Sequence, residues 1–229
     1  MTMSDHTVTA FDDDLQMLVA KISEMGGIAE SMVARSVSAL ITADKSLGQA
    51  VVAEDKLMDA LQIEVDDQVV RLIAKRQPMA GDLREAVGAL RMASDLERIG
   101  DLAKNIARRS MEIENNLPPK KLMRGLQRLA NVSLEQLKDG LDAYAAKDLD
   151  KAVAVWERDD EIDSLYTSLF RELLTYMMED PRNITYCTHL LFCAKNIERI
   201  GDHVTNLTES VSYMMTGDYD METRVERSG

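Results

Sequence analysis

The chain has 229 residues, of which 45% are hydrophobic and only 4% aromatic, and its 40 acidic and 27 basic side chains give a formal net charge of −13. This acidity repels nucleic acids and anionic lipids, and it disfavours free phosphate or a nucleotide as the main ligand. Cations and basic protein surfaces are the expected partners of a chain long enough for one or two domains with a real core.

Helical periodicity dominates the first half of the chain. It predicts helices over residues 10–43, 47–77 and 78–115. Gly26 and Gly27 interrupt the first of these, and because glycine costs about 1 kcal/mol relative to alanine in a helix, we expect a close helix approach or a bend there. Pro78 suits the start of the third helix, where its fixed φ and missing donor do no harm.

The second half repeats this plan. It predicts helices over residues 120–146, 149–179 and 181–216. Pro118 and Pro119 lie in a polar stretch that separates the halves. The predicted fold is all-α, with two tandem three-helix bundles (six helices) related by internal duplication. Its parts are a first bundle over 1–117, a second over 118–216 and a flexible, fraying tail over 217–229.

Three features bear on location. Cys187 and Cys193 are six positions apart on a predicted helix, too far round the cylinder for a disulfide, so we expect core packing and a reducing cytoplasm. The acidic segment 1–14 does not have the pattern of a signal peptide. No run of eighteen apolar residues is present, so we expect no direct membrane insertion and any role at a membrane through a partner.

One acidic motif occurs twice. Residues 97–101 read Glu-Arg-Ile-Gly-Asp, residues 198–202 repeat them, and Asn105 and Asn206 each follow four positions later. Steps of four residues place side chains on one helix face, so each half carries a ladder of Glu, Asp and Asn. Like charges at this spacing repel each other, which suggests that a metal ion or a basic partner compensates them.

The second helix of each half supplies a further acidic pair. Since helices joined by a short turn run antiparallel, these pairs should lie at the height of the ladders, facing outward or into a groove and not buried in the core. The candidate metal ligands are Asp55, Asp59, Glu97 and Asp101 in the first half and Asp159, Asp163, Glu198 and Asp202 in the second.

Carboxylate and amide oxygens suit Mg²⁺, Mn²⁺ or Ca²⁺, and also iron where several carboxylates bridge. Zinc is less favoured without a Cys or His cluster, but the identity of the surface metal ions stays open among iron, Mn, Mg and Zn. His203 is a further candidate ligand, although a lone surface histidine is more often solvated. The plainer alternative is a solvated acidic face with local ion pairs from Arg98 and Arg199, each worth about 0.3–0.5 kcal/mol.

No catalytic constellation is present in the sequence. None of His6, His189 and His203 follows a Glu by three residues, as a di-iron bundle would require, and no glycine-rich phosphate loop follows a strand. We therefore predict a non-enzymatic protein. Two alternatives stay open: a metal-carboxylate enzyme and a purely structural helical scaffold.

Several segments of the chain together resemble the PhoU family, the accessory proteins of bacterial phosphate-specific transport. The likeness runs in order from Asp14 to Thr216 and covers both repeats. The segments that carry it are Met25-Gly26-Gly27, Ile73-Ala74-Lys75-Arg76-Gln77-Pro78, Asp82-Leu83-Arg84, Leu96 to Asp101, Leu174 to Asp180 and Asn196 to Asp202.

This resemblance implies a six-helix, two-bundle protein that negatively regulates the phosphate-starvation response. It implies partners as well: the ATPase subunit of a phosphate ABC transporter, a phosphate-sensing histidine kinase and a second copy in a homodimer. Some relatives carry metal clusters on Glu/Asp-x-x-x-Asp motifs, which correspond to the eight acids above. The second-half counterpart of Asp82-Leu83-Arg84 is Asn183-Ile184-Thr185, a departure which suggests that the halves differ in their partners.

Overall fold

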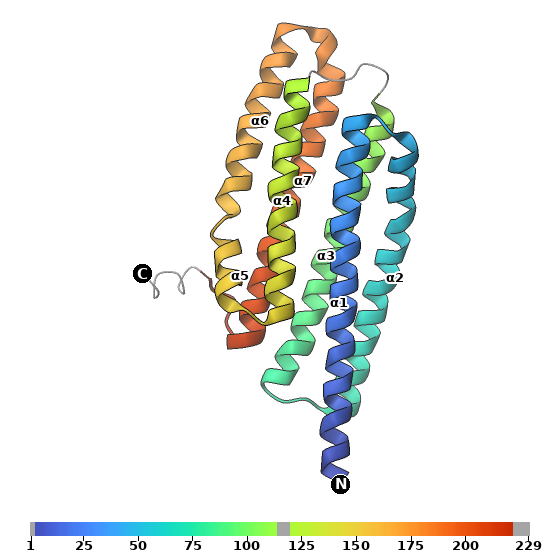
Figure 1. The fold of residues 1–229 in the computed structure, drawn as a ribbon, viewed down its shortest axis with the longest axis vertical. Helices are drawn as coiled ribbons and strands as arrows, with labels where there is room; N and C mark the ends of the chain where they lie inside the picture. Colours follow the sequence, from blue (N-terminus) through green and yellow to red (C-terminus); the bar gives the residue numbers. More distant parts are fainter. Residues whose placement is uncertain (1–2, 114–119, 222–229) are drawn as a thin grey trace.

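The computed structural model describes residues 3–113 and 120–221. The first half forms three long antiparallel helices, as predicted (Figure 1). They are α1 (Met3–Thr42), α2 (Lys45–Arg76) and α3 (Gly81–Glu112). The first therefore begins before the expected residue 10. The predicted end of the third helix at residue 115 lies outside the described residues.

The second half repeats the bundle with one interruption. Its elements are α4 (Lys120–Ala146), α5 (Leu149–Trp156), α6 (Asp159–Glu179), the short 3₁₀ helix η1 (Pro181–Asn183) and α7 (Ile184–Thr216). The prediction of one continuous helix over 149–179 is wrong at Glu157 and Arg158, which separate α5 from α6. The buried Gln136 side chain donates to the Arg158 carbonyl at 2.9 Å, so an α4 side chain holds the carbonyl at the interruption.

Equivalent turns use equivalent residues where the duplication is preserved. Asp44 and Asp148 each accept a hydrogen bond at 3.0 Å from the backbone N–H three residues later, which caps α2 and α5.

The turns at the two prolines differ from the prediction. Gln77 adopts a left-handed conformation (φ 47°) that ends α2, so Pro78 lies in a connection and α3 begins only at Gly81. Pro181 opens η1 and not the α-helix itself.

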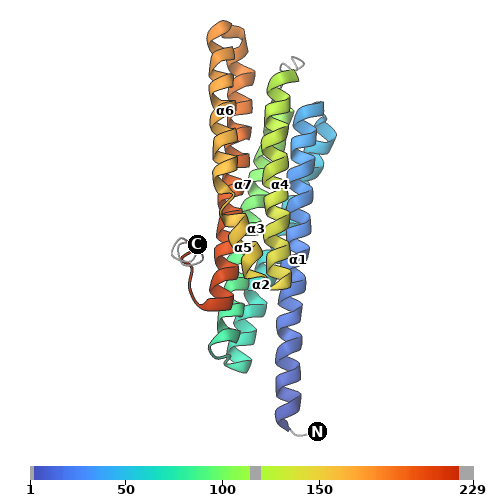
Figure 2. The same ribbon diagram turned by 60° about the vertical axis from the view of Figure 1, so that its left-hand side comes forward.

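The two bundles pack through their central helices. α3 and α7 run antiparallel side by side, and α1 and α4 make the second contact between the halves (Figures 1 and 2). The predicted close approach at Gly26 is confirmed: a Cβ there would lie 2.7 Å from the Leu141 δ-methyls of α4. Gly27 points into open space, with nothing within 4 Å of such a carbon.

The core is aliphatic and rich in methionine, as the composition indicates. Cys187 and Cys193 are buried free thiols within it, so the expectation of core packing is confirmed. Across the described ranges, no helix combines the length and the hydropathy needed to cross a bilayer. The predicted domain boundary at 117/118 falls outside the described residues and stays a prediction.

The residues that follow α7 fold back onto the bundle. Gly217 ends α7 with φ 84°, after which the Tyr219 ring stacks on that of Tyr213 at 4.1 Å and lies 4.3 Å from the Arg91 guanidinium. Met221 is only 2% exposed. The prediction of a fraying tail from 217 is therefore wrong for residues 217–221, because two aromatic rings and a buried methionine anchor them. Residues 222–229 lie outside the described range.

Candidate functional site

The first candidate cluster lies between α2 and α3. The pKa of Glu97 shows the influence of the other predicted acids. Burial raises the pKa of its carboxyl, and the negative charges of Asp101, Asp59 and Asp55 raise it further. The positive charge of Arg98 lowers it, but by less. Because such couplings act only over short distances, the pairs from the two helices lie at one height. The four acids of this half are therefore near enough for the other three to affect Glu97, and their use as metal ligands stays a prediction.

Two basic side chains share this first cluster. The Lys104 ammonium donates to Asp55 Oδ2 at 2.6 Å and also contacts Asp101. Burial tends to lower the pKa of Lys104, but the hydrogen bonds to Asp101 and Asp55 outweigh it and leave the pKa raised. The Arg98 guanidinium lies 3.6 Å from Glu97 and 3.7 Å from Asp101. The local ion pair expected of Arg98 is therefore present.

The second cluster repeats the arrangement between α6 and α7. Burial raises the pKa of Glu198, a hydrogen bond from Lys195 opposes this, and the charges of Asp202 and Asp163 add to the rise. Burial likewise raises the pKa of Asp159, a hydrogen bond from Thr205 lowers it, and Asp163 and Asp202 raise it. These mutual effects indicate that the four acids of the second set lie near one another as well.

The glycine of each repeated motif lets the acid-bearing helices approach. A Cβ on Gly100 would lie 3.3 Å from Met58 Cγ, and one on Gly201 would lie 2.7 Å from Ile162 Cδ1. Met58 precedes Asp59 and Ile162 precedes Asp163 in the sequence. The motif therefore supplies two acids to each cluster and also the gap that admits the neighbouring helix.

Two of the eight acids contradict the prediction of outward-facing side chains. Asp55 is 7% exposed and Glu198 is 9% exposed. Both sit at the contact between their own helix and its neighbour, so the adjoining side chains cover them. Helical periodicity alone could not show this, because it reports the direction of a side chain but not what the next helix places over it.

His203 takes a role different from the one expected. Its Nδ1 lies 2.9 Å from Asp95 Oδ1 on α3, and its side chain is half-buried. The imidazole is thus directed at the other bundle, so it is neither solvated nor turned to the acids of its own half. The ion pair expected for Arg199 is also missing: within the described part of the chain it has no acidic partner within 4 Å.

The lysines and a threonine are the site residues that sequence reasoning missed. Lys104 follows Asp101 by three residues and Lys195 precedes Glu198 by three, a spacing that places each pair on one helix face. The sequence could therefore have predicted these two local ion pairs. It could not have predicted the contact of Lys104 with Asp55, because that contact joins residues 49 positions apart.

The arrangement can hold a cation only with side-chain movement. Among the side chains described for residues 13–113 and 120–221, no three or more His, Cys, Asp or Glu groups are already arranged as a metal-binding set. Glu198 Oε2 is buried and accepts no hydrogen bond from the described residues, while Oε1 of the same carboxylate bonds Lys195. A buried carboxylate oxygen without a partner is costly, and a bound cation would satisfy it.

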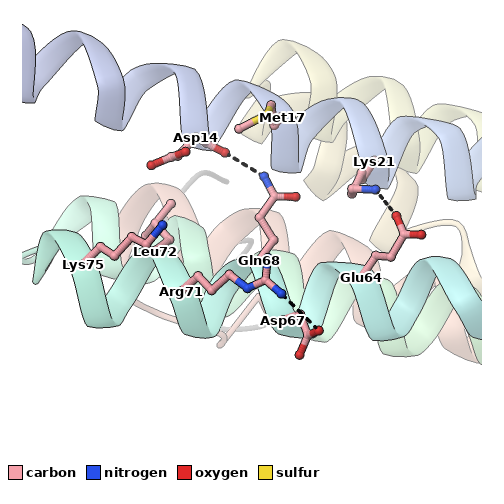
Figure 3. Close-up of a pocket in the computed structure, with 9 residues that line it drawn as sticks. All are labelled: Asp14, Met17, Lys21, Glu64, Asp67, Gln68, Arg71, Leu72 and Lys75. Carbon is pink, nitrogen blue, oxygen red and sulfur yellow. Dashed lines mark hydrogen bonds and ion pairs between the residues drawn. The ribbon is translucent and has the colours of Figure 1, made fainter.

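A separate groove of about 360 Å³ runs between α1 and α2 (Figure 3). Its charges pair with one another: Lys21 bonds Glu64, Arg71 lies 3.7 Å from Asp67, and Gln68 donates to the Asp14 carbonyl at 3.2 Å. Because these groups already satisfy one another, the groove is a weaker candidate for binding than the clusters.

The fold and the site define an all-helical protein made of two copies of one three-helix unit, each with a cluster of four carboxylates. The sequence model described as "PhoU domain" matches residues 22–110 and 126–211, once in each unit. The chain belongs to the PhoU family.

Named relatives and solved structures agree with this membership. The chain is 57% identical over 212 residues to a phosphate-specific transport system accessory protein PhoU homolog of Rhizobium meliloti (strain 1021), covering 93% of this chain and 90% of that one. The Caulobacter vibrioides homolog is 50% identical and 94% of each chain is covered.

Two crystal structures share the fold. PhoU from Pseudomonas aeruginosa superposes with a TM-score of 0.86 at 36% identity, over 90% of this chain and 99% of that one. The phosphate transport system regulatory protein PhoU from Streptococcus pneumoniae gives 0.85 at 27% identity, over 92% and 99%. The predicted six-helix, two-bundle architecture is thereby confirmed.

Proposed function

We propose that this protein is a non-enzymatic regulator of phosphate uptake and phosphate-starvation signalling. It acts in the cytoplasm as an adaptor between the ATPase subunit of a phosphate ABC transporter and a phosphate-sensing histidine kinase, as a homodimer and a negative regulator. The observation that supports this most is the family membership, with relatives named phosphate-specific transport accessory proteins along more than nine-tenths of the chain.

The charge of the molecule supports docking to basic partner surfaces. The net charge is −13, and the carboxylate clusters lie on α2 and α3 in the first half and on α6 and α7 in the second. An acidic surface speeds association with a basic partner and repels acidic ones. A basic or mobile segment of the transporter ATPase or of the kinase fits this surface.

Co-purification tests the adaptor role. The full chain carrying an affinity tag is incubated with the transporter ATPase subunit, and separately with the kinase, at high and at low phosphate. We expect retention of both partners that changes with phosphate and weakens with added salt, because salt screens exposed charges. Absence of both partners under every condition, with phosphate regulation unchanged in cells that lack the protein, would contradict the proposal.

We also propose that the carboxylate clusters bind divalent metal ions. The donor chemistry suits iron, Mn²⁺ or Mg²⁺ better than zinc, and the unpartnered Glu198 Oε2 supports a cation in the second half. Glu198, Asp202, Asp159 and Asp163 would hold it there. A bound ion would supply positive charge that relieves the mutual repulsion of these carboxylates and alters the acidic surface presented to partners.

Metal content of the purified protein tests this second proposal. Glu198→Gln with Asp202→Asn should reduce bound metal measured by elemental analysis after dialysis. Asp67→Asn is the control, because Asp67 is an exposed α2 acid outside both clusters. Equal metal content in the wild type, the double variant and the control would exclude the second cluster as a metal site.

A further inference from the structure

The two carboxylate clusters are neutralised differently although they arise from one repeat. The motifs are offset by 101 positions (198 − 97), so Lys104 on α3 corresponds to Thr205 on α7. Each side chain bonds the first acid of the candidate pair on the neighbouring helix, which is Asp55 on α2 and Asp159 on α6. Lys104 Nζ donates to Asp55 Oδ2 at 2.6 Å, and Thr205 Oγ1 donates to Asp159 Oδ1 at 3.2 Å.

The equivalent contacts carry different charge. Lys104 places an ammonium between α2 and α3, where it also contacts Asp101 and where its side chain is only 15% exposed. Thr205 supplies a neutral hydroxyl in the same place. The lysine of the second cluster, Lys195, bonds a single oxygen of Glu198 and is 46% exposed, so it lies at the edge of the cluster and not inside it.

The arginine of the repeated motif also neutralises acids in the first cluster and not in the second. Arg98 lies within 3.7 Å of Glu97 and Asp101, whereas Arg199 has no acidic partner within 4 Å among the described residues. The first cluster therefore sets two basic side chains against its four carboxylates, and the second sets one. Only the second keeps a buried carboxylate oxygen, Glu198 Oε2, without a partner in the described part of the chain.

We propose that Lys104 takes the place of a bound cation in the first cluster, so that this chain binds a divalent ion in its second half only. The inference rests on the proposed metal binding. An incoming dication would meet the ammonium at close range and would need Asp55 and Asp101, which Lys104 already bonds. Entry would require Lys104 to leave a largely covered position. In the second cluster Thr205 would release one neutral hydrogen bond, and the more exposed Lys195 holds Glu198 through Oε1, which leaves Oε2 of Glu198 open to a cation.

An exchange of the equivalent residues tests the proposal. The full chain is titrated with Mn²⁺, followed by calorimetry and by the electron paramagnetic resonance signal of the free ion. The double variant Glu198→Gln with Asp202→Asn should no longer bind Mn²⁺. The double variant Glu97→Gln with Asp101→Asn should bind Mn²⁺ like the wild type. Lys104→Thr should add a second binding event that is lost again with Glu97→Gln and Asp101→Asn. Thr205→Lys should remove the original one.

Two further variants test whether poor folding or the general loss of a positive charge could explain the result. Lys104→Gln keeps a donor toward Asp55 without the charge, so it should also gain binding if Lys104→Thr folds poorly. Lys75→Thr removes an exposed lysine of α2 outside both clusters and should leave the number of bound Mn²⁺ ions unchanged. Circular dichroism verifies that every variant is folded.

The outcomes separate this inference from the proposal beneath it. Wild-type protein that binds Mn²⁺ in neither cluster would overturn both. Wild-type protein that binds Mn²⁺ in both clusters would overturn only the assignment of Lys104 and leave metal binding intact. The same holds if folded Lys104→Thr and Lys104→Gln variants gain no binding while the second cluster binds Mn²⁺.

Discussion

Nδ1 of His203 lies 2.9 Å from Oδ1 of Asp95, and this contact joins α7 of the second bundle to α3 of the first. The same carboxylate oxygen accepts a hydrogen bond from Asn206 Nδ2 at 3.2 Å. Asn206 is the last member of the second ladder, so one end of that ladder is held against the opposite bundle. The repeated motif thus contributes to the packing of the two halves as well as to the clusters.

Asp95→Ala should destabilise the fold. The substitution leaves the half-buried His203 and the exposed Asn206 without their shared acceptor, and for the covered His203 group the lost hydrogen-bond partner costs about 1–3 kcal/mol. Urea unfolding followed by circular dichroism measures the change. Asp67→Ala, at an exposed acid of α2, is the control and should stay within about 0.5 kcal/mol of the wild type. Equal unfolding midpoints for the two variants would refute the role of Asp95.

Alanine substitutions at the two adjacent glycines of α1 should act in opposite directions. Gly27→Ala should stabilise the protein by about 1 kcal/mol, because alanine is the better helix former and nothing lies within 4 Å of the new carbon. Gly26→Ala should destabilise it, because its Cβ would lie 2.7 Å from Leu141 and overpacking costs about 1–3 kcal/mol. Thermal unfolding of both variants decides this, and shifts of the same sign would be incompatible with a tight α1–α4 contact.

Glu97→Gln should stabilise the metal-free protein at neutral pH. The pKa of Glu97 is raised in the folded state, so its charge opposes folding: the stability it contributes is complete below its ordinary pKa of 4.5 and is lost as pH rises through the folded value. The expected gain is at least a few tenths of a kcal/mol, the size of a like-charge pair on a helix.

Urea unfolding in the presence of a chelator, from pH 4 to pH 8, measures this difference. The gap between Glu97→Gln and the wild type should be largest at neutral pH and should close below about 4.5. Asp67→Asn, outside the clusters, provides the reference for loss of one negative charge from the whole molecule. A gap that widened toward acid would show that the carboxylate is stabilising in the folded state.

Tyr219→Ala should release the segment 217–221 without unfolding the bundles. It removes the stack on Tyr213 and the contact with Arg91, which together are worth about 1–2 kcal/mol. Amide hydrogen exchange in this segment should therefore become roughly tenfold faster, since about 1.4 kcal/mol is a factor of ten. Tyr219→Phe keeps both ring contacts and should exchange like the wild type. Unchanged exchange in Tyr219→Ala would show that other contacts hold the segment.

Much of the architecture was predictable because it depends on local pattern. The repeated Glu-Arg-Ile-Gly-Asp motif revealed the duplication, and 3.6-residue periodicity defined the long helices. Periodicity could not locate the interruption at Glu157 and Arg158, where Gln136 of another helix holds a carbonyl. Nor could it show the anchoring of residues 217–221, which depends on Arg91, far away in sequence.

The sequence by itself determined which side chains are candidates, since spacing of four residues on a helix fixes which acids share a face. Only the tertiary structure decided what surrounds each acid. It covered Asp55 and Glu198 and directed His203 to the other bundle. It also set Lys104 against Asp55 where the duplicate has Thr205 against Asp159. The physical reason is that burial and charge pairing depend on the neighbouring helix, and packing brings that helix close from a distant part of the chain.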